Sequence, residues 1–350
     1  MIVTIIYTLL ILFLALFYDF NNTKSRNQYI IVISVILFLI SGLRNLHVGP
    51  DDTAIYYNSY LYNGHLTYSE VYLNAFKDPF YSVFARFLYD IIGPHYTILL
   101  CVYASIFVFS ICRLLIKNKV EDPLVSFVIL LAMGFFAFSM TGIRQTLAMS
   151  FTVLSYPYLK DRKLIKFVAL VLVASLFHKS ALCFLILYPL TYVKLDWKLI
   201  IMYIGIWVCV FVQKDFLLNK LLTSELDSRL EIYSELGSRG LSVSGLIQLL
   251  LFLIFSLMYS KDIIKRDSSS VILFHMLFLS IIFQLFAGTI AEFFRIAMYF
   301  SVFLILLIPK VISIIPNASR NLVRTCLIFL LLCYFLFMGS GKIPYFFFFN

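Results

Sequence analysis

Residues 41–60 gather polar and ionisable side chains in a chain that otherwise contains few of them. The stretch reads SGLRNLHVGPDDTAIYYNSY and directly follows an apolar segment. Asp51 or Asp52 could accept a proton from a substrate hydroxyl, cap the following helix or pair with Arg44. Tyr56 and the tyrosines near it could stack on sugar rings, or they could form an aromatic belt at a membrane interface. In a chain with so few polar side chains, a polar cluster at the end of an apolar helix is where chemistry would be carried out.

Two further polar groups lie in the middle of the chain. Arg144 lies in SMTGIRQTLAMS, next to Gln145, where its guanidinium could bind a phosphate or a carboxylate through two hydrogen bonds; an interfacial arginine is the alternative. His178 lies in SLFHKSALC, close to Ser180 and between two apolar segments of only about 14 to 15 residues. It could act as a general base or as a donor to an oxyanion or phosphate, or it could be a hydrogen-bonded structural histidine.

The second half of the chain adds two pairs of candidates. Glu292 and Arg295 are three residues apart, so they share a helix face and could pair with each other inside the membrane. In SELDSRLEIYSELGSRG, apolar residues recur at helical spacing, which predicts an amphipathic helix on the membrane surface. From that helix Arg229 and Arg239 could reach a lipid phosphate, although a solvated charged face is the simpler interpretation.

Composition determines which elements must position these groups. Hydrophobic residues make up 62% of the 350 residues and charged residues 13%. Many apolar runs approach or exceed the roughly 18 residues that indicate a transmembrane helix. The sequence therefore predicts an all-α polytopic membrane protein, with residues 1–350 forming a single integral membrane domain of about twelve transmembrane helices. The predicted spans are near 2–18, 29–43, 95–116, 122–141, 143–159, 163–177, 179–193, 197–213, 241–260, 270–288, 293–309 and 322–340.

The basic residues indicate the orientation. Alternate short connections carry Lys24, Arg26, Arg113, Lys117, Lys119, Lys160, Arg162, Lys163, Lys166, Lys194, Lys198, Lys261, Lys265, Arg266, Lys310, Arg320 and Arg324. These are 17 of the 28 Lys and Arg, with only 7 of the 18 Asp and Glu on the same face. The positive-inside rule places this face in the cytoplasm and both termini outside. The net charge of +10 then reflects topology, so nucleic-acid binding is not needed to explain it.

This orientation puts two long segments, about 44–94 and 214–240, on the outer face. Both are expected to carry interfacial helices, the first over 79–93. The inner connections are too short to hold a catalytic domain, so an enzymatic site would lie outside. The six cysteines have no zinc or CxxC spacing and are expected to be packing residues. Walker, GxGxxG and GxSxG motifs are absent from the sequence, which leaves ATPase, nucleotide-cofactor and serine-hydrolase functions without support.

Three stretches together resemble the EpsG/Wzy-type polysaccharide polymerases. They are GLRNLHVGPDDTAIYYNSY, GIRQTLAMSFTVLSYPYLKDRKLIKFVALVLVASLFHKSALCFLILYPL and a C-terminal IPYFFF. The family pattern transfers to Arg44, Gly49, Asp51 or Asp52, Tyr56, Arg144, Gln145, His178 and Ser180. The extra acidic residue leaves the aspartate register open, because Asp51 fits Gly-x-Asp whereas Asp52 with Thr53 fits an Asp-Thr variant. The resemblance extends over nearly the whole chain.

The resemblance implies polymerisation of lipid-linked oligosaccharide repeat units at the outer face of the bacterial cytoplasmic membrane, giving O-antigen, capsule or exopolysaccharide. The growing glycan would move from undecaprenyl pyrophosphate to a sugar hydroxyl of a new lipid-linked unit. The candidates for the base are Asp51, Asp52, Glu292 and His178. The candidates for binding substrate and pyrophosphate are Arg44, Arg144, Gln145, Arg229, Arg239, Arg295 and Tyr56. Because pyrophosphate leaves readily, we expect an inverting displacement without a metal or other cofactor.

The expected partners are the lipid-linked oligosaccharide, membrane lipid, and a chain-length regulator and a flippase of the same pathway. Two other classes share some of these features. A flippase for lipid-linked sugars would also be basic and multi-spanning, but it should show an internal repeat, and none is clear here. An O-antigen ligase or a membrane acyltransferase would share the histidine and arginine chemistry. A ligase usually has one large outer loop late in the chain, whereas the loop at 214–240 is modest. An acyltransferase normally needs a site open to a cytoplasmic acyl donor, whereas His178 is predicted to lie outside.

Overall fold

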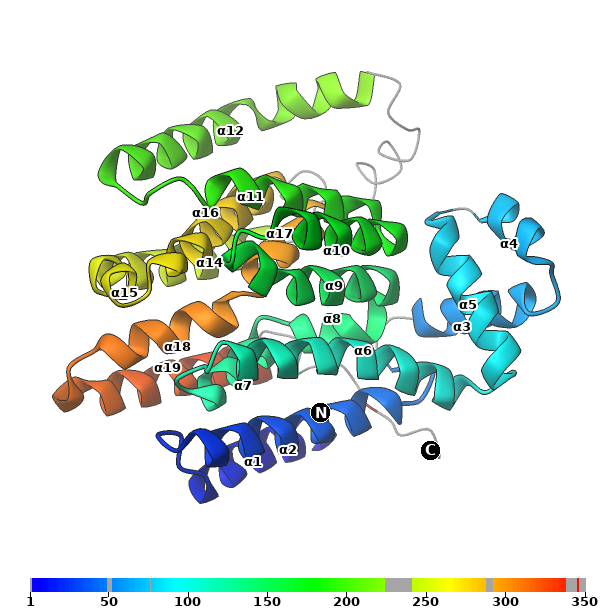
Figure 1. The fold of residues 1–350 in the computed structure, drawn as a ribbon, viewed down its shortest axis with the longest axis horizontal. Helices are drawn as coiled ribbons and strands as arrows, with labels where there is room; N and C mark the ends of the chain where they lie inside the picture. Colours follow the sequence, from blue (N-terminus) through cyan, green and yellow to red (C-terminus); the bar gives the residue numbers. More distant parts are fainter. Residues whose placement is uncertain are drawn as a thin grey trace. The chain divides into compact units, whose positions relative to one another are not determined.

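The computed structural model describes residues 2–48, 52–75, 77–223, 241–287, 292–337 and 345, and these consist of helices joined by short loops (Figure 1). By their packing, the helices divide into two compact units. Unit 1 comprises Met1–Pro157, Ile165–Leu182 and Ile315–Asn350, and unit 2 comprises Tyr158–Leu164 and Cys183–Ile314. Over these residues the structure confirms the predicted all-helical architecture. The single membrane domain over 1–350 stays a prediction.

Unit 1 is built mainly from the N-terminal half of the chain. Its helices are α1 (Ile2–Leu14), η1 (Ala15–Phe17), α2 (Thr23–Gly42), α3 (Asp52–Asn63), α4 (Tyr68–Asn74), α5 (Pro79–Ile92), α6 (Tyr96–Lys117), α7 (Pro123–Ala132), α8 (Phe135–Thr141), most of α9 (Ile143–Lys160), α10 (Leu164–Phe177) and α19 (Asn317–Phe337). The long helix α2 packs along α6, and α19 packs on α7. The short helices α3, α4 and α5 pack on one another and form a group at one end of α6 (Figure 1).

Unit 2 is arranged around α16. After η2 (Lys179–Ile186), its helices are α11 (Leu187–Leu190), α12 (Trp197–Thr223), α14 (Leu241–Met258), α15 (Ser260–Arg266), η3 (Ser268–Ser270), α16 (Val271–Phe286), α17 (Glu292–Ser301) and α18 (Leu304–Ile314). Helices α12, α14, α17 and α18 all contact α16. Most of the α16 side chains are buried, which fits a helix that is apolar on every face.

Local sequence determines where several helices begin. Asn22 accepts hydrogen bonds from the backbone N–H groups of Lys24 and Ser25 and so caps α2. Asp122 caps α7, in which Pro123 takes the first position, where its missing N–H costs nothing. Thr67 and Glu70 form a reciprocal capping box at the start of α4.

In the part of the chain that the structure describes, fewer helices than the predicted twelve meet the length and hydropathy of a membrane span. Each of the twelve predicted segments coincides with a helix or a helix pair. Among the described residues, however, only four helices are long and apolar enough to cross a membrane, or up to seven if each sharply bent pair is one span. Helix α10 illustrates the reason. Its 14 residues extend about 21 Å, which is shorter than the roughly 30 Å hydrocarbon layer.

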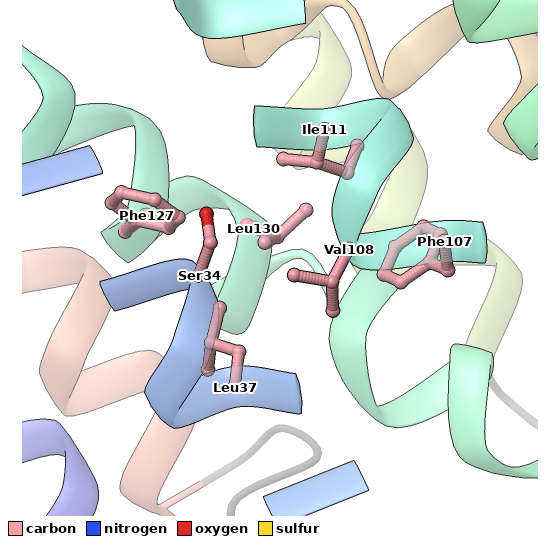
Figure 2. Close-up of a pocket in the computed structure, with 7 residues that line it drawn as sticks. All are labelled: Ser34, Leu37, Phe107, Val108, Ile111, Phe127 and Leu130. Atoms are coloured by element: carbon pink, nitrogen blue, oxygen red, sulfur yellow. The ribbon is translucent and has the colours of Figure 1, made fainter. Parts of the chain in front are cut away.

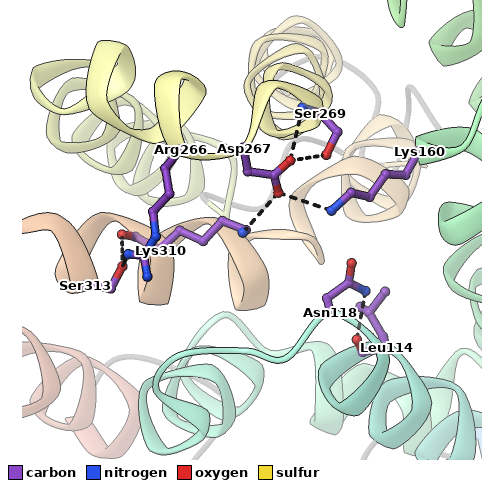
Figure 3. Close-up of polar contacts among 8 residues, drawn as sticks. All are labelled: Leu114, Asn118, Lys160, Arg266, Asp267, Ser269, Lys310 and Ser313. Atoms are coloured by element: carbon purple, nitrogen blue, oxygen red, sulfur yellow. Dashed lines mark hydrogen bonds and ion pairs between the residues drawn. The ribbon is translucent and has the colours of Figure 1, made fainter. Parts of the chain in front are cut away.

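Polar residues that the sequence assigns to the cytoplasmic connections form two clusters, one in each unit. In unit 2, Asp267 accepts from the ammonium groups of Lys160 and Lys310 at 3.1 and 3.4 Å (Figure 3). Although burial by itself raises its pKa, hydrogen bonds from Ser269 and Lys160 and the charge of Lys310 hold the pKa of this carboxyl well below its usual range. In unit 1, the guanidinium of Arg324 pairs with Asp122 at the start of α7.

Unit 1 also has a narrow crevice between α2, α6 and α7 that has no room for a water molecule (Figure 2). Its lining is apolar except for one hydroxyl group. The lining residues are Ser34, Leu37, Phe107, Val108, Ile111, Phe127 and Leu130. A crevice without ionisable side chains cannot carry the predicted acid–base chemistry, so the candidate site must be sought where the charged groups lie.

Candidate functional site

Arg44 follows the C-terminus of α2 and is almost completely buried, with 1% of its surface exposed. Its Nη1 donates to the backbone carbonyl of Ser41 and, at 3.3 Å, to the Ser41 hydroxyl. Its Nη2 donates to the backbone carbonyl of Met140 at 2.9 Å. Burial lowers the pKa of the guanidinium to about 10, so the group remains a cation at neutral pH. Arg44 thus joins the C-terminal ends of α2 and α8, where a positive charge is favourable.

Two other side chains form hydrogen bonds to carbonyl groups at these helix ends. The hydroxyl of Thr53, in the first turn of α3, donates to the same Met140 carbonyl at 3.0 Å. The hydroxyl of Tyr345 donates to the carbonyl of Ile40 in the last turn of α2. Tyr345 belongs to the C-terminal IPYFFF stretch, so the structure brings the first and last parts of the motif pattern together.

Arg144 opens helix α9 and points toward the loop before α5. Its Nη1 lies 3.1 Å from a carboxylate oxygen of Asp78, and its Nε donates to the Tyr56 hydroxyl at 3.3 Å. The guanidinium carbon lies 5.8 Å from the centre of the Tyr56 ring, within cation–π range. The Arg144 side chain is 23% exposed, so it is held by neighbours and still reachable from outside the protein.

The sequence pattern did not single out Asp78, although its carboxylate pairs with the predicted arginine. It occupies the N-cap position of α5, directly before Pro79, with the left-handed backbone angles φ 48° and ψ 66°. Its side chain is 9% exposed. The signal available in the sequence is an acidic residue before the Pro of a predicted interfacial helix. Such a residue would ordinarily be interpreted as a helix cap.

Buried tyrosines support this arrangement. The ring of Tyr56 packs edge-on against Tyr81 of α5 at 5.6 Å. The Tyr81 hydroxyl lies 3.3 Å from that of Tyr103 on α6. Both Tyr81 and Tyr103 are at most 6% exposed. The position of Tyr56 beside Arg144 is therefore set by packing from α5 and α6, which places Tyr56 among the residues of the candidate site.

The other middle candidates lie near the ends of their helices. His178 follows α10, and its Nδ1 is 2.6 Å from the hydroxyl of Ser180. That short contact fixes the orientation of the imidazole ring. Gln145 is 3% exposed on α9, next to Arg144. His178, Gln145 and Arg144 all belong to unit 1.

The remaining candidates are distributed differently. Arg295 is half-buried on α17, in unit 2. Asp52 and Glu292 are the first residues of α3 and α17, but their side chains lie outside the described part of the chain. Gly49, Asp51, Arg229, Arg239 and the predicted amphipathic helix also lie outside the described residues. The structure therefore brings together Arg44, Tyr56 and Arg144 of the predicted residues and adds Thr53 and Asp78.

The described residues contain no group of three or more His, Cys, Asp or Glu side chains that could hold a metal ion. The six cysteines are free thiols. The metal-independent mechanism stays a prediction, since the side chains of several acidic candidates are not described.

Comparison with known proteins gives one match. The model of the EpsG family matches residues 27–349, which is nearly the whole chain and includes every residue of the site described above. Neither the curated proteins nor the solved structures gave a match.

Proposed function

Because the chain belongs to the EpsG family, whose members are Wzy-type polymerase-like proteins, we propose that it is a glycosyltransferase that polymerises polysaccharide repeat units. Its substrates are oligosaccharides carried on undecaprenyl pyrophosphate at the outer face of the bacterial cytoplasmic membrane. The observation that carries this assignment is Arg144, a partly exposed arginine held between Asp78 and Tyr56.

The contacts within each unit support the proposed grouping of the connections on two faces. Arg44, Tyr56, Asp78 and Arg144 come from connections or helix ends that the charge distribution assigns to the outer face, and within unit 1 they lie around one another. The partners in the Asp122–Arg324 pair both come from connections assigned to the cytoplasm. The same is true in unit 2 of Lys160, Asp267 and Lys310. A wrong assignment of connections to the two faces would have mixed residues of both faces in these clusters, and the choice of the cytoplasmic face rests on the positive-inside rule.

In the proposed reaction, a hydroxyl of the incoming lipid-linked unit attacks the anomeric carbon of the growing glycan. The bond from that carbon to the pyrophosphate oxygen breaks, and its electron pair leaves with the pyrophosphate. Arg144 stabilises the departing charge through charge-assisted hydrogen bonds. The proton of the attacking hydroxyl goes to a base, for which Asp51, Asp52, His178 and Glu292 remain the candidates. One displacement without a covalent intermediate inverts the anomeric configuration.

Arg44 takes a different role from the one suggested by its residue type. Its buried guanidinium bonds backbone carbonyls at the ends of α2 and α8, so we assign it to positioning the helix ends and not to holding pyrophosphate. Since α9 follows α8 after only Gly142, a shift of Met140 would displace Arg144. Arg44 is thus expected to affect activity through Arg144.

Deletion of the gene in the native host, followed by electrophoresis of the surface polysaccharide, tests the proposal. A polymerase deletion should reduce the ladder of chain lengths to single repeat units, and the wild-type gene should restore the ladder. Loss of all exported repeat units would indicate a flippase. Polymer of normal length that stays on its lipid carrier would indicate a ligase. Either of these two outcomes would reject the polymerase assignment.

A further inference from the structure

Asp78 adopts a conformation that local sequence does not favour. An aspartate at an N-cap position normally has extended backbone angles and accepts a hydrogen bond from an N–H group of the first helical turn. Asp78 has left-handed angles instead, and its side chain makes no such bond to the described residues of α5. A residue before proline also favours extended angles. Holding such a residue in the left-handed region costs on the order of 1–3 kcal/mol, so surrounding contacts must compensate for it.

The compensating contact is the ion pair with Arg144. The carboxylate lies 3.1 Å from Nη1, with the side chain of Asp78 9% exposed and that of Arg144 23% exposed. Nε of the same guanidinium is occupied by Tyr56 at 3.3 Å. The carboxylate therefore occupies a position on Nη1 where an oxyanion of a ligand could form a charge-assisted bond.

We propose that Asp78 is a resident counter-ion of Arg144 and is displaced when a diphosphate binds there. The diphosphate forms the bond to Nη1 that Asp78 gives up, and the freed carboxylate can then cap the first turn of α5. Repulsion between the carboxylate and the diphosphate favours its departure. The choice of ligand rests on the proposed function, whereas the displacement itself concerns only the site.

This arrangement makes Asp78 a specificity-determining residue. A ligand that binds Nη1 at this position must replace a partly buried ion pair. A single negative charge only exchanges one ion pair for another, whereas a diphosphate carries further charge and further acceptor oxygens. The site should therefore discriminate against monoanionic lipid headgroups, which are far more abundant in a membrane than the diphosphate carrier.

Binding of a diphosphate to the purified full-length protein tests the proposal. Inorganic pyrophosphate and undecaprenyl pyrophosphate are titrated separately, in lipid nanodiscs, against the wild type and Asp78→Asn. The asparagine keeps an oxygen that can accept from Arg144, and it tolerates left-handed backbone angles. We expect Asp78→Asn to bind about tenfold more tightly, equivalent to about 1.4 kcal/mol. Asp78→Gly, which removes both the charge and the backbone strain, is the second variant if the first folds poorly.

Asp90→Asn is the matched control. Asp90 lies on the same helix α5 and also pairs with an arginine, Arg86, but its side chain is 43% exposed. The control removes the same charge away from Arg144 and should change the dissociation constant less than twofold. Arg144→Gln should lose diphosphate binding both in the otherwise wild-type protein and when combined with Asp78→Asn. Tightening with both ligands supports displacement by any diphosphate, and tightening with the lipid alone supports displacement by the carrier headgroup.

Three results would overturn the proposal. These are an affinity of Asp78→Asn that is equal to or weaker than that of the wild type, equal tightening by Asp90→Asn, or no binding by any variant. The binding assay is independent of glycosyl transfer. A protein that fails the polysaccharide test but shows tighter diphosphate binding in Asp78→Asn would reject the proposed function and keep the displacement.

Discussion

Replacing Arg44 by methionine, alone and together with Thr53→Val, measures how much the buried guanidinium stabilises the site. The carbonyl of Met140 accepts from two side chains, Nη2 of Arg44 at 2.9 Å and the hydroxyl of Thr53 at 3.0 Å. Either single variant leaves this carbonyl with one of its side-chain donors. The double variant removes both, so the two substitutions should not be additive.

The contacts give the expected magnitudes. Thr53→Val should cost about 1 kcal/mol, because the guanidinium still serves Met140. Arg44→Met removes the donor to Ser41 as well, at a cost of about 1–3 kcal/mol for a buried acceptor. Releasing a buried cation offsets part of that cost, which makes the single variant hard to interpret. This offset is the same whether Arg44 is replaced in the wild type or in Thr53→Val, so it cancels in the double-mutant cycle. The cycle then leaves a coupling energy of about 1–2 kcal/mol at the Met140 carbonyl.

The assay is the unfolding free energy of the purified protein in detergent, determined for wild type, both single variants and the double variant. Polymer length in cells is measured in parallel. Additivity within about 0.5 kcal/mol would refute the shared-carbonyl argument. If Arg44→Met had the unfolding free energy of the wild type but abolished the polymer, Arg44 would contact the substrate and would not be a positioning residue.

Three further outcomes are expected. Arg144→Ala should reduce long polymer by about 100-fold while the protein stays in the membrane, since one preorganised donor to a leaving group contributes about that much. Normal chain length in this variant would reject the role of Arg144, and Arg86→Ala is the control. Asp267 has a lowered pKa in the folded protein, so it stabilises above about pH 4 and this stabilisation is lost as the pH falls further. The unfolding midpoint of the wild type should therefore drop more on acidification than that of Asp267→Asn, and equal drops would contradict the ion-pair cluster. Cysteines introduced at 51 or 178 should react with impermeant reagents added outside the cell, and labelling only from the cytosol would reject the outer-face site.

The fold class could be predicted from the sequence because it depends on composition and periodicity, which are local properties. A chain that is 62% hydrophobic with few charges must satisfy its backbone hydrogen bonds within helices when it enters a bilayer. Each predicted span coincides with a helix or helix pair for this reason. The number of crossings could not be obtained in the same way, because hydropathy does not reveal sharp bends such as the 52° angle between α7 and α8, which lies at the left-handed residue Gly134.

The candidate site shows the same division between what the sequence predicts and what only the tertiary structure determines. Residue type and position were enough to identify Arg144 and Tyr56 as candidates, since charged and aromatic groups at span ends are conspicuous in an apolar chain. Their pairing was decided by the tertiary structure, because Arg144 is 88 residues from Tyr56 and 66 from Asp78. The tertiary structure also determines the role of Arg44. Whether a guanidinium meets a ligand or a backbone carbonyl depends on which distant helix end approaches it, and no local pattern records that approach.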